Sequence, residues 1–554
     1  MPRKHRPARP REPKACRACA YAKVRCVSEP QAELGDPCKR CVRLKRGCMM
    51  QAPGAHKRAG ESSLDVTRLE EKLDGMAAAF TASRTPLPVD TGGDGGLSTS
   101  LLDESLLPRD EAEMALYTFR TEMAPYFPFI VVHPHTTVSE MRRAKPFLFD
   151  AIAMVSCLDA DRQSEMAHMV SEHIGTLIIT KGERNLDLLQ GLLVCLAWYH
   201  FQLERGSQLC SVHHLAWVML INLDLNRNPS LVNSMPMRDF LGDTAKQNTS
   251  HTLEEQRAYL GCFYMSAVLS TCLQGTNSMK YTDYTKECCR VIEHAAEYPT
   301  DLYLVRLVRL HRLADRISRT LSRDEIDLPG YPSPPISLCI NVLEAELQHL
   351  KPPLPPASLH DLIFLMHHHN LELSLYEIAL RDDFPARHRI HPTERVNILS
   401  SCLSATKSFI DQFSSIPPRF YLNLPYPVYA AYCHAIGTLS NLLLFSGEGW
   451  DPEYARSKID IPNVLTMLII KIENAAETSR HEQPPYRFPE AFVGLVPRLR
   501  AIGENHEARR AAALQDKPGG SASDDDSGSA TQDVTQDMMF QLPHGFSWRF
   551  LQPR

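Results

Sequence analysis

The residues of this chain with the clearest chemical potential are six cysteines within its first 48 positions. They follow the spacing C-x2-C-x6-C, and after eleven intervening residues the same spacing repeats. A repeat over so short a stretch indicates one shared site rather than unrelated thiols. Cysteines separated by two residues are typical metal ligands, because one turn of chain presents both sulfurs to the same ion. The candidate metal ligands are Cys16, Cys19, Cys26, Cys38, Cys41 and Cys48.

Zinc is the metal that this set of thiolates favours, because Zn²⁺ takes sulfur ligands in a tetrahedral shell. One zinc ion would use four of the cysteines and leave two without a role. Two separate tetrahedral ions would need eight bonds from six ligands. The bond count closes if two sulfurs bridge both ions, so the motif predicts a cluster of two Zn²⁺ ions.

Other uses of the cysteines fit the sequence less well. A disulfide framework is typical of secreted proteins, whereas this chain opens with MPRKHRPARP and shows no apolar signal segment. Iron–sulfur clusters usually take four cysteines at other spacings. A zinc module that only contacts other proteins stays open as an alternative to one that binds DNA.

The charge of the chain is divided between a basic head and an acidic remainder. Residues 1–60 contain 16 Lys and Arg but 4 Asp and Glu, which gives a net charge of +12. The whole chain carries −5, so the remainder carries −17. Double-stranded DNA would attract the head, and counterion release would make binding depend on salt.

The basic arm at residues 1–15 is a candidate nuclear localisation signal or phosphate-binding arm.

Basic side chains alternate with the cysteines inside the motif. We expect each half of the motif to form a short helix followed by an extended segment. The helix after Cys19 would enter the major groove, where Lys or Arg can bind O6 and N7 of guanine. The candidate DNA contacts are Arg17, Lys23, Arg25, Lys39, Arg40 and Arg43.

The motif over residues 16–48 resembles the fungal binuclear zinc cluster family of transcription factors. The resemblance implies that Cys16 and Cys38 are the sulfurs that bridge the two metal ions. It also matches Lys23 to the lysine that contacts a CGG-type half-site, and Arg25 to a basic position close to the DNA backbone. Two positions depart from the family, which often has basic residues there: Ala20 and Ala22.

Between the motif and the large body the sequence predicts three connecting segments. Residues 49–65 contain glycine and proline without an apolar stripe and form a linker. Over residues 66–83 apolar residues recur at alternating spacings of three and four, which is the pattern of a short coiled coil. The alternative is an isolated amphipathic turn or a disordered segment. Residues 84–109 form a flexible tether. A dimer through the coiled coil would bind two half-sites. The seam consists of Val66, Leu69, Leu73, Met76 and Phe80.

Residues 110–510 are predicted to form a large all-α regulatory domain. The chain is 44% hydrophobic, and its apolar residues recur at helical rather than strand spacing. Thr252, followed three residues later by Glu255, predicts a capping box. The apolar stretch 191–201 is too short to cross a membrane and is expected to be a buried helix. Residues 220–229 and 257–270 are similar to the family's helical middle homology region, which implies regulation by a small molecule or a protein.

The body contains no motif that nominates catalytic residues. The sequence has no P-loop, no dinucleotide-binding glycine pattern, no H-E-x-x-H and no G-x-S-x-G. Consecutive helical residues point about 100° apart, so a metal site is not expected at His367, His368 and His369. The ten other cysteines show no ligand spacing and are expected to be buried.

The tail at residues 511–554 is predicted to be disordered, with an acidic part followed by an aromatic end. This composition favours an activation segment that folds on a transcriptional coactivator. The alternative is that the aromatic end docks on the helical body.

These features together predict a nuclear, sequence-specific transcription factor of RNA polymerase II genes. It would be an activator that binds double-stranded DNA as a homodimer at CGG-type half-sites, without enzymatic activity and without a membrane partner. The alternative is a zinc-stabilised protein-interaction or corepressor scaffold that does not read bases. The predicted fold class is mostly α, with a small binuclear zinc cluster module, a short coiled coil and linker, a large all-α regulatory domain and a disordered acidic C-terminal tail.

Overall fold

The computed structural model divides the chain into two compact units, Met1–Gly96 and Leu97–Arg554. Helices are the regular elements throughout the part of the chain that it describes, and no strand occurs there, which confirms the mostly α fold class. The predicted linker, coiled coil and acidic tail lie outside the described residues, apart from residues 511–515 at the end of the last helix. The described residues are 26, 38–44, 48, 100–102, 106–157, 159–199, 208–229, 250–272, 278–321, 335–352, 356, 358–381, 384, 390–481 and 490–515.

The first part of the body is built on two buried helices that pack against each other, α6 (Pro146–Ser156) and α8 (Leu186–Ala197). Helix α8 contains the start of the apolar stretch that the sequence predicts to be a buried helix, and that prediction is confirmed. The close packing needs Gly191, because a Cβ atom there would lie 2.3 Å from the ring of Phe147. The neighbouring helices are α4 (Arg109–Thr118), α5 (Val138–Ala144), α7 (Ala160–Ile174) and α9 (Leu209–Asn222).

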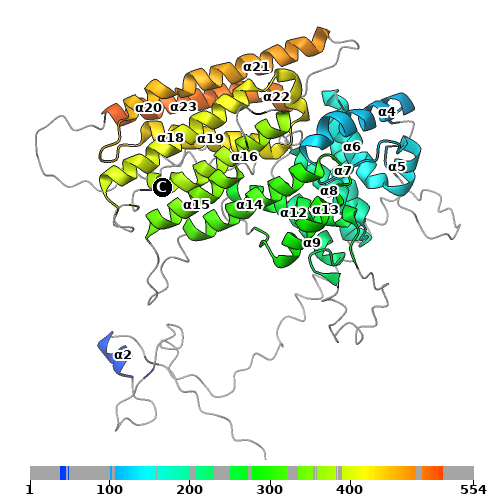
Figure 1. Ribbon diagram of the computed structural model, residues 1–554, viewed down its shortest axis with the longest axis horizontal. Helices are drawn as coiled ribbons and strands as arrows, with labels where there is room; N and C mark the ends of the chain where they lie inside the picture. Colours follow the sequence, from blue (N-terminus) through cyan, green and yellow to red (C-terminus); the bar gives the residue numbers. More distant parts are fainter. Residues whose placement is uncertain are drawn as a thin grey trace, which may run out of the picture. The chain divides into compact units, whose positions relative to one another are not determined.

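In the rest of the body, α16 (Leu359–Tyr376) is largely buried, because α14, α15, α18 and α19 all pack against it. Figure 1 shows the later helices α18, α19, α21 and α23 lying side by side in yellow to orange. The bounds are α12 (Leu253–Cys272), α13 (Asp283–Ala295), α14 (Asp301–Leu321), α15 (Ile336–Leu350), α18 (Pro392–Ser415), α19 (Tyr426–Leu444), α20 (Pro452–Lys458), α21 (Ile461–His481), α22 (Glu490–Val493) and α23 (Leu495–Gln515).

Helix starts follow the signals in the sequence. The predicted capping box at α12 is confirmed: the amide of Thr252 donates to the Glu255 carboxylate at 2.8 Å, and the amide of Glu255 donates to Thr252 Oγ1 at 3.2 Å. These bonds satisfy amides that have no partner inside the first turn. Helix α15 ends at Leu350, directly before the proline-rich segment that begins at Pro352, because proline cannot continue a helix.

The described part of the body begins at Ser100, within the segment 84–109 that the sequence assigns to a tether. Asp150 of α6 is fully buried and accepts hydrogen bonds from the Ser100 hydroxyl at 2.6 Å and from the amides of Leu101 and Leu102. Leu102 and Leu107 are both buried in the core of the body. These contacts fix residues 100–102 to α6. Among the residues described, no helix has both the length and the apolar character needed to span a membrane.

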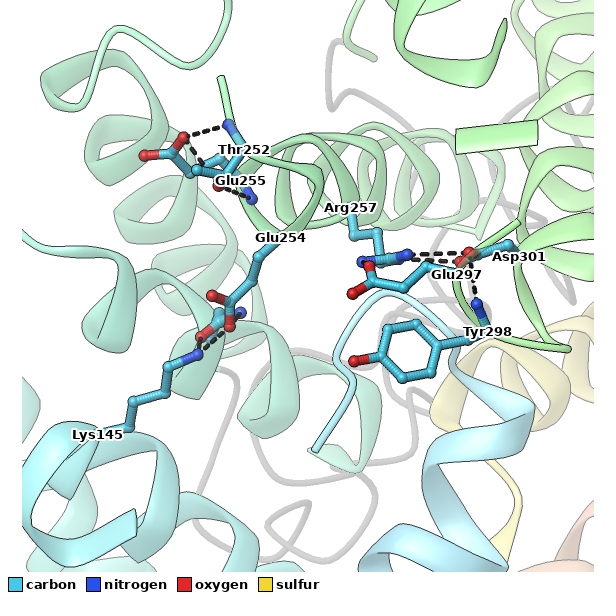
Figure 2. A network of polar contacts seen from close by, with 9 residues as sticks. Lys145, Thr252, Glu254, Glu255, Arg257, Glu297, Tyr298 and Asp301 are labelled. Carbon is cyan, nitrogen blue, oxygen red and sulfur yellow. Dashed lines mark hydrogen bonds and ion pairs between the residues drawn. The ribbon is translucent and has the colours of Figure 1, made fainter. Parts of the chain in front are cut away.

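A buried ion pair joins α12 to the start of α14. The Arg257 guanidinium donates two parallel hydrogen bonds, each 2.9 Å long, to the Asp301 carboxylate (Figure 2). Arg257 is 3% exposed and Asp301 is 0% exposed, so both charges are almost completely shielded from bulk water. Glu297 contacts the outer edge of the same guanidinium at 2.9 Å, and the ring of Tyr298 lies 4.8 Å from it. Bidentate geometry and burial make this pair stronger than the surface pairs of the body.

Replacing Asp301 with alanine should therefore destabilise the body strongly, because it leaves the buried Arg257 charge without its main partner. We expect a loss of about 3–5 kcal/mol in the free energy of unfolding. Arg109→Ala is the control, because its partner Glu113 and Arg109 itself are mostly exposed, and the expected loss is at most about 0.5 kcal/mol. Thermal unfolding of the two variants measures the difference, and equal midpoints would contradict this account.

Candidate functional site

The second half of the cysteine motif is built around a one-turn helix, α2 (Lys39–Arg43). Cys38 precedes it in an extended conformation, and its carbonyl oxygen accepts a hydrogen bond from the amide of Val42 at 3.1 Å. Residues three apart at a helix start lie on the same face, so Cys38 and Cys41 present their sulfurs to one side. Both residues are 2% exposed. The expectation of a short helix in this half is confirmed.

Three sulfurs converge at this point: those of Cys38, Cys41 and Cys48 all lie within 4.8 Å of one another. Tetrahedral zinc with Zn–S bonds of about 2.3 Å separates its sulfurs by roughly 3.8 Å, so the spacing fits thiolate ligands of Zn²⁺. The amide of Cys38 donates a hydrogen bond to Cys48 Sγ at 3.3 Å, a contact that stabilises a thiolate. No disulfide joins any two of the described cysteines.

Cys26, from the first half of the motif, packs against the same sulfur cluster and is partly buried. The structure therefore brings three of the six predicted ligands within 4.8 Å of one another and packs a fourth, Cys26, against them. Cys16 and Cys19 lie outside the described residues. The amide-to-sulfur bond at Cys48 has no signal in the sequence, because it depends on how the chain returns to the cluster.

The basic side chains of α2 lie around the buried sulfurs. Lys39 and Arg43 are exposed and Arg40 is half-buried. Cations beside a thiolate cluster offset its negative charge, and exposed cations raise the local positive potential that attracts a polyanion. The other predicted DNA contacts, Arg17, Lys23 and Arg25, lie outside the described residues.

The body contains a cavity of about 830 Å³ that the sequence did not predict. Its charged wall is shown in Figure 2, where Lys145, at the start of α6, and Glu254, on α12, form an ion pair. Gln190 of α8 is buried and accepts from Lys145 Nζ at 3.0 Å while donating to Glu254 at 2.9 Å. Arg257 lines the same cavity, as do apolar side chains such as Phe129. A mixed polar and apolar lining suits a small molecule.

The three consecutive histidines of α16 turn to different surroundings. His367 Nε2 lies 3.1 Å from the Tyr264 hydroxyl, and its ring centroid lies 5.2 Å from that of His311. Burial lowers the pKa of His311 to about 4 and holds the pKa of His367 well below its usual range. These two rings are therefore neutral members of the core. His368 and His369 instead both face Glu372.

The body is also the part of the chain that known proteins share. Residues 95–433 match the model of the family described as the WAR1 C-terminal domain. The transcription factor opdL of Penicillium oxalicum is 28% identical over 81% of this chain and 81% of its own length. The transcription factor himD of Aspergillus japonicus is 30% identical over 73% of this chain and 69% of its own length.

The transcriptional regulator WAR1 of Candida albicans is more distant, with 22% identity over 69% of this chain and 39% of its own length. No solved structure matches this chain. These relatives are named as regulators of transcription, which agrees with the expectation that the chain is not an enzyme. The family match covers well over half of the chain, and the chain belongs to this WAR1 C-terminal domain family of fungal transcription factors, as the resemblance of its cysteine motif predicted.

Proposed function

We propose that this transcription factor binds DNA directly through a two-zinc cluster, in the nucleus, and activates RNA polymerase II genes. The observation that carries the proposal is the convergence of motif cysteines inside a segment with a net charge of +12. A metal cluster by itself does not require so many cations. A surface that binds the DNA backbone does, because each phosphate contact releases a counterion.

Six thiolates are proposed to hold the two Zn²⁺ ions, with Cys16 and Cys38 as the bridging ligands. Zinc supplies fixed tetrahedral coordination, so it would fold a segment that is too short to build a hydrophobic core. The residues around the metals then have one task, to hold the helix after Cys19 in a fixed orientation. The full ligand set is Cys16, Cys19, Cys26, Cys38, Cys41 and Cys48.

The DNA contacts are proposed to divide between base reading and positioning. Lys23 would reach the guanine edge of a CGG-type half-site in the major groove. The remaining cations would contact phosphates, which fix the register of the protein without reading sequence. The exposed positions of Lys39 and Arg43 on α2 support this second role. The proposed phosphate contacts are Arg17, Arg25, Lys39, Arg40 and Arg43.

The other parts of the chain are proposed to control when and where the head acts. A homodimer through residues 66–83 would place two heads on two half-sites. The helical body would respond to a small-molecule or protein regulator, and the cavity beside Arg257 supports the first of these. The tail at 511–554 would recruit transcriptional coactivators.

Loss of one cluster ligand should abolish specific DNA binding. We expect the zinc-loaded full chain to bind a duplex with CGG half-sites, and Cys41→Ala or treatment with a chelator to reduce binding to the non-specific level. Cys210→Ala is the matched control, because Cys210 lies on α9 outside the motif and should leave affinity unchanged. Fluorescence anisotropy measures all three. Unchanged binding by Cys41→Ala would refute the proposal.

Lys23 and Lys39 should differ in what they recognise. Lys23→Ala should weaken binding to the CGG duplex by about 1–3 kcal/mol and leave binding to random DNA nearly unchanged. Lys39→Ala should weaken both equally and reduce the salt dependence by about one counterion. Titrations of each variant at several salt concentrations separate the two roles. If Lys23→Ala weakened both duplexes equally, Lys23 would be a phosphate contact.

A further inference from the structure

Helix α16 contains a cluster of side chains that neither the fold nor the proposed DNA binding requires. His368, His369 and Glu372 are 0%, 5% and 7% exposed. One potential metal-binding atom from each lies within 4.8 Å of the other two. The residues come together because Glu372 lies four positions after His368 and three after His369, so all three side chains meet along one turn.

The protonation of His368 is fixed by its other contact. Its Nε2 atom lies 2.8 Å from the carbonyl oxygen of Leu347, at the end of α15. A carbonyl only accepts, so Nε2 must carry the hydrogen. Full burial disfavours the imidazolium form, and the neutral ring then presents a bare lone pair at Nδ1. That Nδ1 atom is buried and meets no hydrogen-bond donor among the residues described.

The lone pair of His368 faces another electron-pair donor. Its Nδ1 atom lies 3.7 Å from Glu372 Oε1. Gln348 donates to the Glu372 carboxylate at 2.9 Å, and His369 Nδ1 contacts its second oxygen at 2.6 Å. Hydrogen bonds of this kind favour the ionised carboxylate. A nitrogen lone pair and a carboxylate oxygen therefore point at each other inside the core, an arrangement that a cation between them would stabilise.

The chemistry of the cluster indicates which cation. A histidine that donates one ring N–H to a backbone carbonyl and offers the other nitrogen is the usual form of a metal ligand. Two imidazoles and one carboxylate suit Zn²⁺, whose N and O ligands lie about 2.0–2.2 Å from the metal. Ligand atoms around such an ion are roughly 3.4 Å apart. Nδ1 of His368 lies 3.7 Å from one oxygen of Glu372, and Nδ1 of His369 lies 2.6 Å from the other.

We propose that His368, His369 and Glu372 form a zinc site inside the helical body, separate from the cysteine cluster. Nδ1 of His368 binds without rearrangement. His369 binds through Nδ1 after its hydrogen moves to Nε2, and the metal replaces the hydrogen bond to Glu372. Through the contacts of His368 with Leu347 and of Glu372 with Gln348, the site ties α16 to α15.

The test is the zinc content of the purified full chain, measured by mass spectrometry of the metals. With a two-zinc cluster in the head, the account expects about three zinc ions per chain, and Glu372→Gln should lower the content by one ion. Glu377→Gln is the matched control. Glu377 also contacts a buried histidine, since His434 Nε2 lies 2.9 Å away, but the second nitrogen of His434 is bonded to Asn370. The control variant should therefore keep its zinc.

Cobalt substitution separates this inference from the proposed function. Thiolate ligands give intense charge-transfer absorption with Co²⁺, whereas a histidine and carboxylate site gives only weak visible bands. Glu372→Gln should remove cobalt without changing the thiolate absorption, and circular dichroism should show that the variant stays folded. Equal metal content in the wild type and Glu372→Gln would overturn the inference. Absence of the thiolate absorption would instead contradict the cysteine cluster and leave the test at Glu372 intact.

Discussion

The described part of the cysteine module buries sulfur atoms in its core, where a larger domain buries apolar side chains. The proposed metal binding, folding and DNA binding of the head all depend on this feature. Among its described residues, the buried core consists of Cys38 and Cys41, with Cys26 and Cys48 packed against them. Apolar side chains such as Val42 and Leu44 are instead exposed, at 59% and 43%. The apolar surface buried by these described residues is too small to offset the entropy of ordering them, whereas the proposed coordination of zinc by thiolates would offset it. Metal binding and folding of the head are therefore one event in this account, and any DNA contact from α2 depends on it.

The helical body is stabilised in the opposite way. Its core is a continuous set of large apolar side chains. Buried Arg257 is paired with Asp301, and buried Asp150 accepts hydrogen bonds from the Ser100 hydroxyl and two amides. The two parts also differ in net charge: residues 1–60 carry +12, and the remainder of the chain carries −17. In the proposed function, DNA would repel the acidic remainder of the chain and attract the basic head. The body offers a cavity, and by the inference above a metal site, as places where a second signal could act.

Much of this could be predicted from the sequence, because it depends on local patterns. The spacing of the cysteines predicts their convergence, the pair Thr252 and Glu255 predicts the start of α12, and apolar periodicity predicts the all-α body. What could not be predicted depends on contacts between distant segments. Asp150 binds residues 100–102 although it lies about 50 positions later in the sequence, so the sequence around residue 100 predicts only a flexible tether. The lone pair of His368 is identified only through the contact with Leu347 of another helix, so the angles between consecutive helical residues do not predict the cluster with Glu372.

The central claim is that the head reads DNA sequence and does not merely adhere to a polyanion. Selection of duplexes from a random pool by the zinc-loaded full chain tests it most directly, because the pool offers every sequence with the same phosphate charge. The account predicts enrichment of sites that contain CGG-type half-sites at a fixed spacing, with no enrichment after zinc is removed. Retention of DNA without any enriched sequence would contradict it, and would favour a zinc-stabilised scaffold that does not read bases.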